Sequence, residues 1–218
     1  LPLLSIPILL MLRTPQSASQ SASESSGRSL IQILMMPRYM LAVAAGVVSY
    51  GLMAFVMTAA PIAMVNTGHS VDSAALGIQW HLLAMFAPSF VTGRLMTRFG
   101  KERVTAAGML LIAVSAIVAL AGLELINFWG SLAIMGIGWN FSFIGATAMV
   151  TDCHTPGERA KAQGANDFMV FGTTAAVSFL AGSVLHNSGW AAINWLLFPP
   201  VALILVPLLW QAARKPQA

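Results

Sequence analysis

Residues 168–213 read FMVFGTTAAVSFLAGSVLHNSGWAAINWLLFPPVALILVPLLWQAA, and this stretch carries no formal charge. A helix rises about 1.5 Å per residue, so one pass through a hydrocarbon core of about 30 Å takes about 20 residues. The run is long enough for two such passes, and Asn187-Ser188-Gly189 supplies a turn between them. The stretch therefore predicts a pair of membrane-spanning helices.

The same scarcity of charge extends over most of the chain. Only 8% of the 218 residues are Asp, Glu, Lys or Arg and 57% are hydrophobic, whereas charged residues make up about 25% of ordinary globular proteins. A soluble domain of this size cannot bury so much apolar surface. The predicted fold class is an all-α integral membrane protein. Its six transmembrane helices are expected at about 40–65, 73–93, 104–123, 127–150, 164–185 and 191–211.

The ends of the chain differ in composition from its middle. Residues 1–12 are apolar but lack the basic start of a signal peptide, and we interpret them as the truncated end of a preceding transmembrane helix. Residues 13–38 are predicted to form a cytoplasmic linker, which is Ser-rich at first and then short and amphipathic over 28–36. The six-helix unit then covers 39–213, and 214–218 form a short tail.

All eleven basic residues fall on one face of this predicted topology. They lie in the linker, in the loops after the second and fourth helices and in the tail, whereas the loops around His69, Glu124 and His186 have none. Because Lys and Arg concentrate in cytoplasmic loops, the linker, the basic loops and the tail are predicted to be cytoplasmic. We expect a multi-pass protein of a bacterial inner membrane. The topology also explains the pI of 9.9 without nucleic acid as a partner.

The loop after the second predicted helix carries a recognisable pattern, GRLMTRFGKER, over residues 93–103. It resembles the G-x-L-x-D-R-x-G-R-[KR] signature of the major facilitator superfamily. The matching positions are Gly93, Leu95, Arg98, Gly100 and Lys101. Thr97 stands where the family usually has Asp, and Glu102 where it often has a basic residue.

A second likeness lies at the start of the fifth predicted helix. Thr155-Pro156-Gly157-Glu158 has the form of a capping box with Pro at the first helical position, and it is similar to the superfamily's loop into the fifth helix of a six-helix half. The resemblance implies the C-terminal half of a twelve-helix transporter, which works by alternating access around a midplane site. The implied partners are the N-terminal half, the lipid bilayer and a small-molecule substrate. Gly93, Arg98, Gly100 and Lys101 would form a loop that takes part in the conformational change.

Polar side chains inside the predicted spans mark a candidate substrate site, because such groups are costly in hydrocarbon. Gln79, Trp80 and His81 lie together in the second helix, and Trp139 and Asn140 follow two glycines near the middle of the fourth. Tryptophan can stack on a ligand, while His and the two amides can hydrogen-bond to it. The alternatives are interhelical hydrogen bonds for His81 and Asn140 and an interfacial anchor for Trp80.

The first predicted helix contains residues to which we assign a structural role. Tyr50 and Thr58 are expected to pack, and Pro61 is expected to bend the helix because it lacks a backbone donor; the alternative is that the three residues line the external half of the helix. The thirteen Met residues fill apolar space.

Asp167 is the acidic residue that falls inside a predicted span. Gln163, Asp167, Thr174 and Ser178 repeat at helical spacing and predict a polar stripe on one face of the fifth helix. We interpret Asp167 and His81 as candidates for proton coupling, because a carboxyl group and an imidazole can each take up and release a proton. The alternative for Asp167 is a structural ion pair near the cytoplasmic boundary.

The predicted function is secondary active transport of a small molecule by alternating access, driven by a proton gradient, in a protein that is not an enzyme. The chain contains no G-x-x-x-x-G-K-[ST] phosphate loop, so no nucleotide motor is expected. We expect no cofactor and no metal site, since the single Cys153 excludes a cysteine cluster. The short cytoplasmic loops leave no room for a catalytic domain. A membrane sensor or scaffold of the same fold that does not transport is the alternative.

Overall fold

The computed structural model describes residues 27–214, and every regular element in that range is helical. The all-helical class predicted from the sequence is therefore confirmed for the described part of the chain. The expected helix remnant at 1–12, the first part of the linker and the end of the tail lie outside the described residues. In chain order the elements are α2 (Leu30–Leu34), α3 (Pro37–Asn66), α4 (Val71–Phe86), α5 (Ser89–Phe99), α6 (Lys101–Leu120), α7 (Leu125–Thr151), the 3₁₀ turn η2 (Pro156–Glu158), α8 (Arg159–Trp195) and α9 (Phe198–Arg214).

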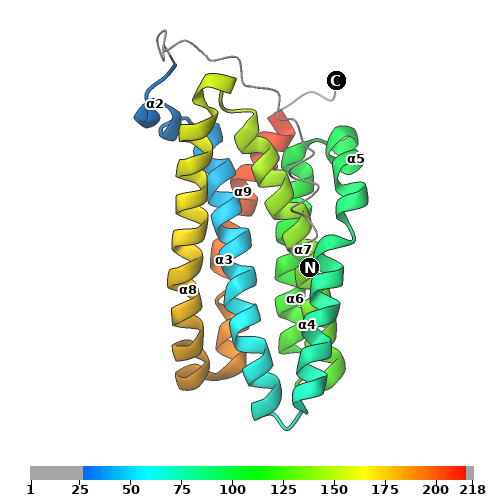
Figure 1. The fold of residues 1–218 in the computed structure, drawn as a ribbon. Helices are drawn as coiled ribbons and strands as arrows, with labels where there is room; N and C mark the ends of the chain where they lie inside the picture. Colours follow the sequence, from blue (N-terminus) through cyan, green and yellow to red (C-terminus); the bar gives the residue numbers. More distant parts are fainter. Residues whose placement is uncertain (1–26, 215–218) are drawn as a thin grey trace, which may run out of the picture.

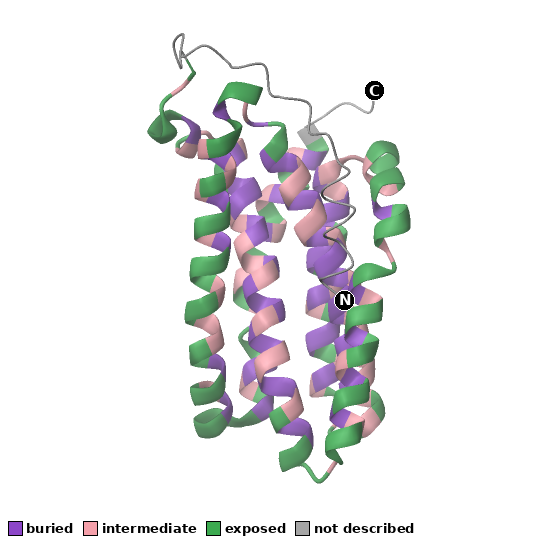
Figure 2. Ribbon diagram, in the orientation of Figure 1, coloured by how far each residue is buried: buried purple, intermediate pink, exposed green. Residues whose placement is uncertain are grey.

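The long helices form one elongated bundle, in which the chain runs back and forth between two ends (Figure 1). Helix α7 has a central place, because it packs against α6, α4 and α3, while α8 packs against α3 and α9 against α6. Buried side chains gather on the faces where these helices meet, and the outer faces of α4, α5 and α8 are exposed (Figure 2). The apolar core therefore lies along α3, α6, α7 and α9, while α4, α5 and α8 are left partly uncovered.

Four helical ranges are long and apolar enough to cross a membrane, namely Pro37–Asn66, Lys101–Leu120, Leu125–Thr151 and Pro156–Ala213. A fifth candidate arises when Val71–Phe86 and Ser89–Phe99 are taken as one broken span. The described chain thus has four or five candidate spans where the sequence predicted six. The difference lies in the range Pro156–Ala213, which contains both α8 and α9. Figure 1 shows these two helices running in opposite directions, and Gly189 breaks the helical backbone inside α8, near its C-terminal end, with φ 77°.

The second helix, predicted over about 73–93, is interrupted in the structure. The structure ends α4 at Phe86 and starts α5 at Ser89, with a bend of 41° between them. Pro88 causes the break, because proline has no backbone N–H to donate and its ring clashes with the carbonyl one turn earlier. The broken helix places a bend near the middle of the bundle.

Turn chemistry predicted from the sequence is confirmed at two positions. Gly100 ends α5 with φ +90°, a left-handed conformation that favours glycine. The capping box before the fifth helix is present, since the backbone N–H of Thr155 donates to Glu158 Oε2 at 2.9 Å. A second capping box, Ser29 with Gln32, starts the short helix α2. These turns lie with the start of α3 and the end of α9 at one end of the bundle, called the basic end below (Figure 1).

Glycines allow α7 to approach its neighbours closely, as the pair Gly136 and Gly138 in the fourth predicted helix suggested. A Cβ atom on Gly136 would lie 2.7 Å from the carbonyl oxygen of His81 in α4. On the other side, a Cβ on Gly108 of α6 would lie 2.3 Å from the backbone nitrogen of Ser142. Only glycine fits at such contacts, and they fix α4 and α6 on opposite sides of α7.

Candidate functional site

Four aromatic rings from three helices meet inside the bundle. Tyr50 of α3 lies edge-on to Trp139 and Phe143 of α7, with ring centroids 5.6 and 5.1 Å apart, and edge-on to Phe171 of α8 at 5.5 Å. Trp139 and Phe143 stack at 5.0 Å with 19° between their planes. These are the preferred geometries of aromatic pairs. Tyr50, Trp139, Phe143 and Phe171 are called the ring cluster below.

Three members of the ring cluster lie at the same depth in the bundle. Tyr50, Trp139 and Phe171 are each about 12 residues from the terminus that their helix has at the basic end, which is about 18 Å along the axis. Half the thickness of a hydrocarbon core is about 15 Å. The ring cluster is therefore near the middle of the membrane-spanning part.

The ring cluster combines a buried donor with rings that are partly open. Trp139 is 7% exposed, and its indole Nε1 is buried without an acceptor among residues 27–214. Phe171 is 53% exposed, while Tyr50 is half-buried and its hydroxyl has no hydrogen bond within the described chain. Sequence reasoning assigned Tyr50 to packing and did not single out Phe143 or Phe171.

Asn140 follows Trp139 but faces away from the ring cluster, toward the break in the second helix. Its Nδ2 donates to the carbonyl oxygen of Met85 at 2.8 Å and to Ser89 Oγ at 2.7 Å, and its Oδ1 accepts from Thr92 Oγ1 at 2.6 Å. The side chain is fully buried. Most of the amide's hydrogen-bonding capacity is thus used on both parts of the broken helix. These contacts correspond to the interhelical alternative that the sequence left open.

Gln79, Trp80 and His81 are neighbours in the chain, but the structure separates their side chains. His81 is fully buried against α7, where its Nδ1 lies 2.8 Å from the carbonyl oxygen of Leu132. A carbonyl only accepts, so Nδ1 carries the proton there. Gln79 and Trp80 are exposed, since successive residues of a helix point in different directions. The structure does not bring this trio together with Trp139.

Asp167 is exposed on α8, one helical turn from Phe171 toward the basic end. Its Oδ1 accepts a hydrogen bond from Asn166 Nδ2 at 3.1 Å, and it forms no ion pair within residues 27–214. Gln163 lies one further turn along the same face. Asp167 and Gln163 therefore extend a polar stripe from the ring cluster toward the basic end.

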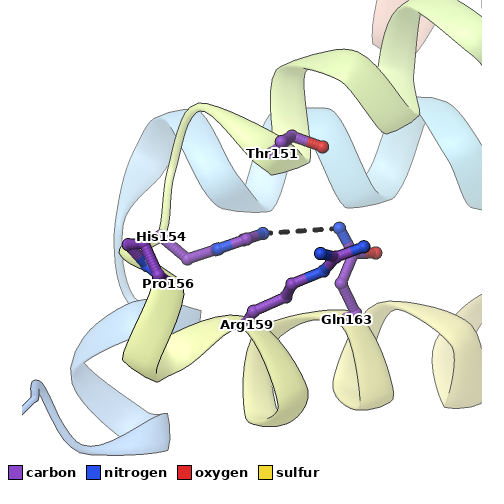
Figure 3. A pocket seen from close by; sticks show the side chains of 5 residues that line it. All are labelled: Thr151, His154, Pro156, Arg159 and Gln163. Atoms are coloured by element: carbon purple, nitrogen blue, oxygen red, sulfur yellow. Dashed lines mark hydrogen bonds between the residues drawn. The ribbon is translucent and has the colours of Figure 1, made fainter. Parts of the chain in front are cut away.

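A cavity of about 500 Å³ opens at the basic end between α7 and α8 (Figure 3). Figure 3 shows the Arg159 side chain extending beside Gln163, and Gln163 Nε2 lies 3.4 Å from His154 Nε2. Thr151 is the last residue of α7, the helix that also carries Trp139 and Phe143. The cavity thus lies where the polar stripe reaches the end of the bundle. Its lining residues are Thr151, His154, Pro156, Arg159 and Gln163.

The segment predicted as a loop that takes part in conformational change is largely helical in the structure, since Gly93 and Arg98 belong to α5, Lys101 starts α6 and Gly100 alone lies between these helices. Gly93 is exposed, and a Cβ atom there would meet no described atom within 4 Å. Arg98 lies over the ring of Phe99 with its guanidinium carbon 5.2 Å from the centroid. Thr97, which replaces the family's usual Asp, donates only to the carbonyl oxygen of Arg94. The side chains on this loop's outer surface are therefore held by local contacts.

Ion pairs connect the start of α6 and the start of α3 to the end of α7. Lys101 Nζ donates to Asp152 Oδ1 at 2.6 Å and to the carbonyl oxygen of Ala148 at 3.2 Å. Arg38, at the start of α3, donates to Asp152 Oδ2 at 3.1 Å and approaches Glu102 Oε1 at 3.4 Å. Asp152 is thus a carboxylate partner for the loop, although sequence reasoning did not identify it.

The linker is attached to the loop before α8 through Arg28. Its Nη2 donates to Glu158 Oε2 at 2.7 Å and to the carbonyl oxygen of Cys153 at 2.9 Å, while its Nε donates to Glu158 Oε1 at 3.0 Å. The Glu158 carboxylate raises the pKa of Arg28, and burial raises the pKa of the Cys153 thiol. Lys161 adds a bond from its ammonium to the carbonyl oxygen of Arg28. Sequence reasoning did not predict this attachment.

Comparisons with known proteins agree with this architecture. A family model described as Major Facilitator Superfamily matches residues 41–218. The riboflavin transporter RfnT of Brucella anthropi is 66% identical over 214 residues, which are 98% of this chain and 54% of that protein. The uncharacterized MFS-type transporter YdeG of Bacillus subtilis is 33% identical over 165 residues, covering 74% of this chain and 38% of that protein.

A more distant relative is the drug efflux pump JefA of Mycobacterium tuberculosis, 28% identical over 134 residues that cover 59% of this chain and 26% of that protein. The chain thus spans about half the length of RfnT and less of the other relatives. The family match runs from α3 through α9 and includes the loop signature at 93–103. These relatives are transporters by name, and the bundle has the apolar helices that such proteins need. The chain therefore belongs to the major facilitator superfamily.

Proposed function

We propose that the protein is a secondary transporter of flavins, with riboflavin as its substrate, and that this chain forms one half of it. The observation that carries the proposal is the 66% identity to a riboflavin transporter, which extends over 98% of the chain. The aligned region covers α2 to α9 and therefore every helix that contributes to the ring cluster. A sensor or scaffold without transport is not favoured, because the relatives are transporters by name.

The proposed architecture has six passes, formed by α3, the bent pair α4 and α5, α6, α7, α8 and α9. The opposite directions of α8 and α9 support two passes within Pro156–Ala213 (Figure 1). A second six-helix half, preceding this one in the full-length protein, would complete the site. Rocking of the two halves would then expose a midplane site to each side in turn. The loop with Gly93, Arg98, Gly100 and Lys101 would move with the basic end.

Transport would draw on a proton gradient, with Asp167 as the residue that takes up the proton. Its carboxylate is exposed on the partly uncovered helix α8, one turn from the ring cluster. His81 is the second candidate, but its imidazole is enclosed between α4 and α7. In the full-length transporter, we expect Asp167→Asn to abolish the stimulation of uptake by an inward proton gradient, and His81→Ala to leave it. Unchanged stimulation in Asp167→Asn would exclude this role.

The experiment that tests the function is riboflavin counterflow in proteoliposomes that contain the full-length transporter. Vesicles loaded with unlabelled riboflavin should accumulate labelled riboflavin transiently, because exchange through one carrier needs no external energy. Empty vesicles supply the background. Counterflow no greater than that background would exclude riboflavin transport, and riboflavin binding without counterflow would support the non-transporting alternative.

A further inference from the structure

We infer that the ring cluster binds the planar ring system of the substrate and that the Trp139 indole N–H donates to a ring carbonyl. The inference rests on the proposed function, because it names the part of a flavin that these residues recognise. A flavin has a flat tricyclic ring with carbonyl oxygens on one edge and a flexible polyhydroxyl chain. The ring needs aromatic surfaces and a donor, whereas the chain needs polar groups.

The strongest observation is the indole N–H of Trp139. A buried donor is almost always paired in a folded protein, because leaving it unpaired costs about 1–3 kcal/mol. The Trp139 side chain is only 7% exposed, and within residues 27–214 its Nε1 has no acceptor. A ligand carbonyl in the ring cluster would supply the acceptor. Trp190 also has an unpaired indole, but it packs against fully buried Phe128 in the main core, with no open ring beside it.

The second observation is that the ring cluster is not a closed core. Phe171 is 53% exposed on α8, and Tyr50 is half-buried although three rings surround it. Trp139 belongs to a small apolar cluster with Met53 and Met85, which is separate from the main core. Methionine side chains adapt readily to a flat ligand, and aromatic rings contribute stacking in a preferred geometry. The ring cluster thus offers a partly open apolar site for a planar group.

The third observation gives the ligand a direction. From Phe171 the exposed face of α8 continues through Asp167 to Gln163 and ends at the cavity of the basic end. Carboxylate and amide groups can pair with the hydroxyl groups of a flexible chain. The ring would therefore lie in the ring cluster, and the polyhydroxyl chain would point toward the basic end. Asn140 would have no direct contact, because its amide already holds α4 and α5.

Binding by purified full-length transporter tests the inference separately from transport. The probes are riboflavin, the chainless tricyclic ring compound lumichrome, and ribitol, which has only the chain. Quenching of flavin or lumichrome fluorescence gives the dissociation constant Kd, and ribitol is measured as a competitor. We expect lumichrome to bind and ribitol to compete poorly, because stacking on the ring cluster supplies most of the affinity.

Two variants test the stacking ring and the hydrogen-bond donor separately. Phe171→Leu removes an exposed ring, and Trp139→Phe keeps a ring but removes the donor. Each should raise the Kd of both riboflavin and lumichrome about three- to tenfold, the range expected for one aromatic pair or one neutral hydrogen bond. Phe168→Leu is the matched control, since Phe168 is 80% exposed on the same helix and lies outside the ring cluster. It should leave both Kd values unchanged.

The outcomes separate the inference from the proposed function. Wild-type Kd values for lumichrome and riboflavin in both Phe171→Leu and Trp139→Phe would overturn the inference, even if riboflavin counterflow is observed. Weakened lumichrome binding in these variants without any riboflavin counterflow by the wild type would uphold the ring site and overturn the flavin transport. Wild-type protein that binds neither probe would overturn both. Phe171→Leu changes an exposed side chain, so it keeps the test decisive if Trp139→Phe fails to fold.

Discussion

Asn140 connects α7 to both α4 and α5, the two parts of the interrupted second helix. Pro88 ends the hydrogen-bond pattern of α4, and the carbonyl oxygen of Met85 then accepts from the Asn140 amide instead. Ser89 and Thr92 bind the same amide from the other side of the break. A single buried side chain therefore sets the position of α5 relative to α4.

We predict that Asn140→Ala lowers the free energy of unfolding by about 1–2 kcal/mol, because two buried hydrogen bonds and one part-buried hydrogen bond are lost in a mostly apolar environment. The measurement is the thermal unfolding temperature of the purified 218-residue chain in detergent. Gln79→Ala is the control, since Gln79 is exposed on α4 and has no hydrogen bond to the described residues. Equal unfolding temperatures for Asn140→Ala and the wild type would show that the amide does not hold the break.

At the scale of elements, α6 and α7 approach through glycine. A Cβ on Gly108 would lie 2.6 Å from the carbonyl oxygen of Gly138 and closer still to the backbone of Ser142. Backbone atoms cannot give way as a flexible side chain can, so the helices would have to separate. We predict that Gly108→Ala lowers stability by about 1–3 kcal/mol, the range of overpacked cores.

The matched control for Gly108→Ala is Gly172→Ala. Gly172 lies in a helix of the same bundle, and a Cβ atom there meets nothing within 4 Å in the described chain. Alanine is the better helix former by about 1 kcal/mol, so Gly172→Ala should be neutral or slightly stabilising in detergent. A loss of unfolding temperature in Gly172→Ala equal to that in Gly108→Ala would contradict the backbone contact.

The attachment of α2 gives a second element-scale prediction, which uses Cys153. The thiol is buried and donates to the carbonyl oxygen of Met149, while Arg28 binds the carbonyl oxygen of Cys153 itself. In Arg28→Ala the linker loses its bonds to Glu158, and we predict faster reaction of Cys153 with a maleimide. The measurement is the labelling rate of the native 218-residue chain, in which Cys153 is the single cysteine.

The sign of that effect follows from the causes of the Cys153 pKa. Burial, the largest cause, raises the pKa, and nearby cations including Arg28 lower it. Removing Arg28 takes away one cation, which by itself would raise the pKa of Cys153. Exposing the thiol removes the larger contribution of burial, so the pKa should fall. Thiolate formation and the access of the maleimide to the thiol should both increase. Arg94→Ala is the control, because Arg94 is exposed at the same end of the bundle. A labelling rate that does not change would mean that α2 stays in place without Arg28.

The sequence predicted those elements that are determined by residues close together in the chain. Charge-free runs mark the long helices, and Gly100 and Thr155 mark turns by their own chemistry. Pro88 was equally visible, but the apolar run around it masked the break. The ring cluster requires knowing that α3, α7 and α8 meet at one depth, which depends on tertiary packing.

Residues that are adjacent in the sequence do not share a place in the candidate site. Gln79, Trp80 and His81 are consecutive, yet a helix turns them toward different surroundings. Arg28 and Glu158 lie 130 positions apart and still form a bidentate pair. Of the residues chosen from the sequence as substrate contacts, Trp139 belongs to the ring cluster, whereas Tyr50 and Phe171 come from helices that are distant in the chain.

On the scale of the whole molecule, the basic residues of the described chain gather at one end of the bundle. Lys101, Asp152, Arg38 and Glu102 join the starts of α3 and α6 to the end of α7. The turns at the opposite end have no Lys or Arg. The basic end therefore combines a charged network, the attached linker and the mouth of the cavity, which suits the side that faces the cytoplasm.

This orientation is the last prediction, and single cysteines test it in a full-length transporter whose other cysteines, Cys153 included, are replaced by Ser. Asn66→Cys lies at the end opposite to the basic end, and Thr97→Cys lies in the last turn of α5 at the basic end; both positions are exposed. In intact cells a membrane-impermeant maleimide should label Asn66→Cys and leave Thr97→Cys unlabelled. Inside-out vesicles should reverse the pattern, which controls for the reactivity of each thiol. Labelling of Thr97→Cys in intact cells would place the basic residues outside, against the distribution that Lys and Arg follow in membrane proteins.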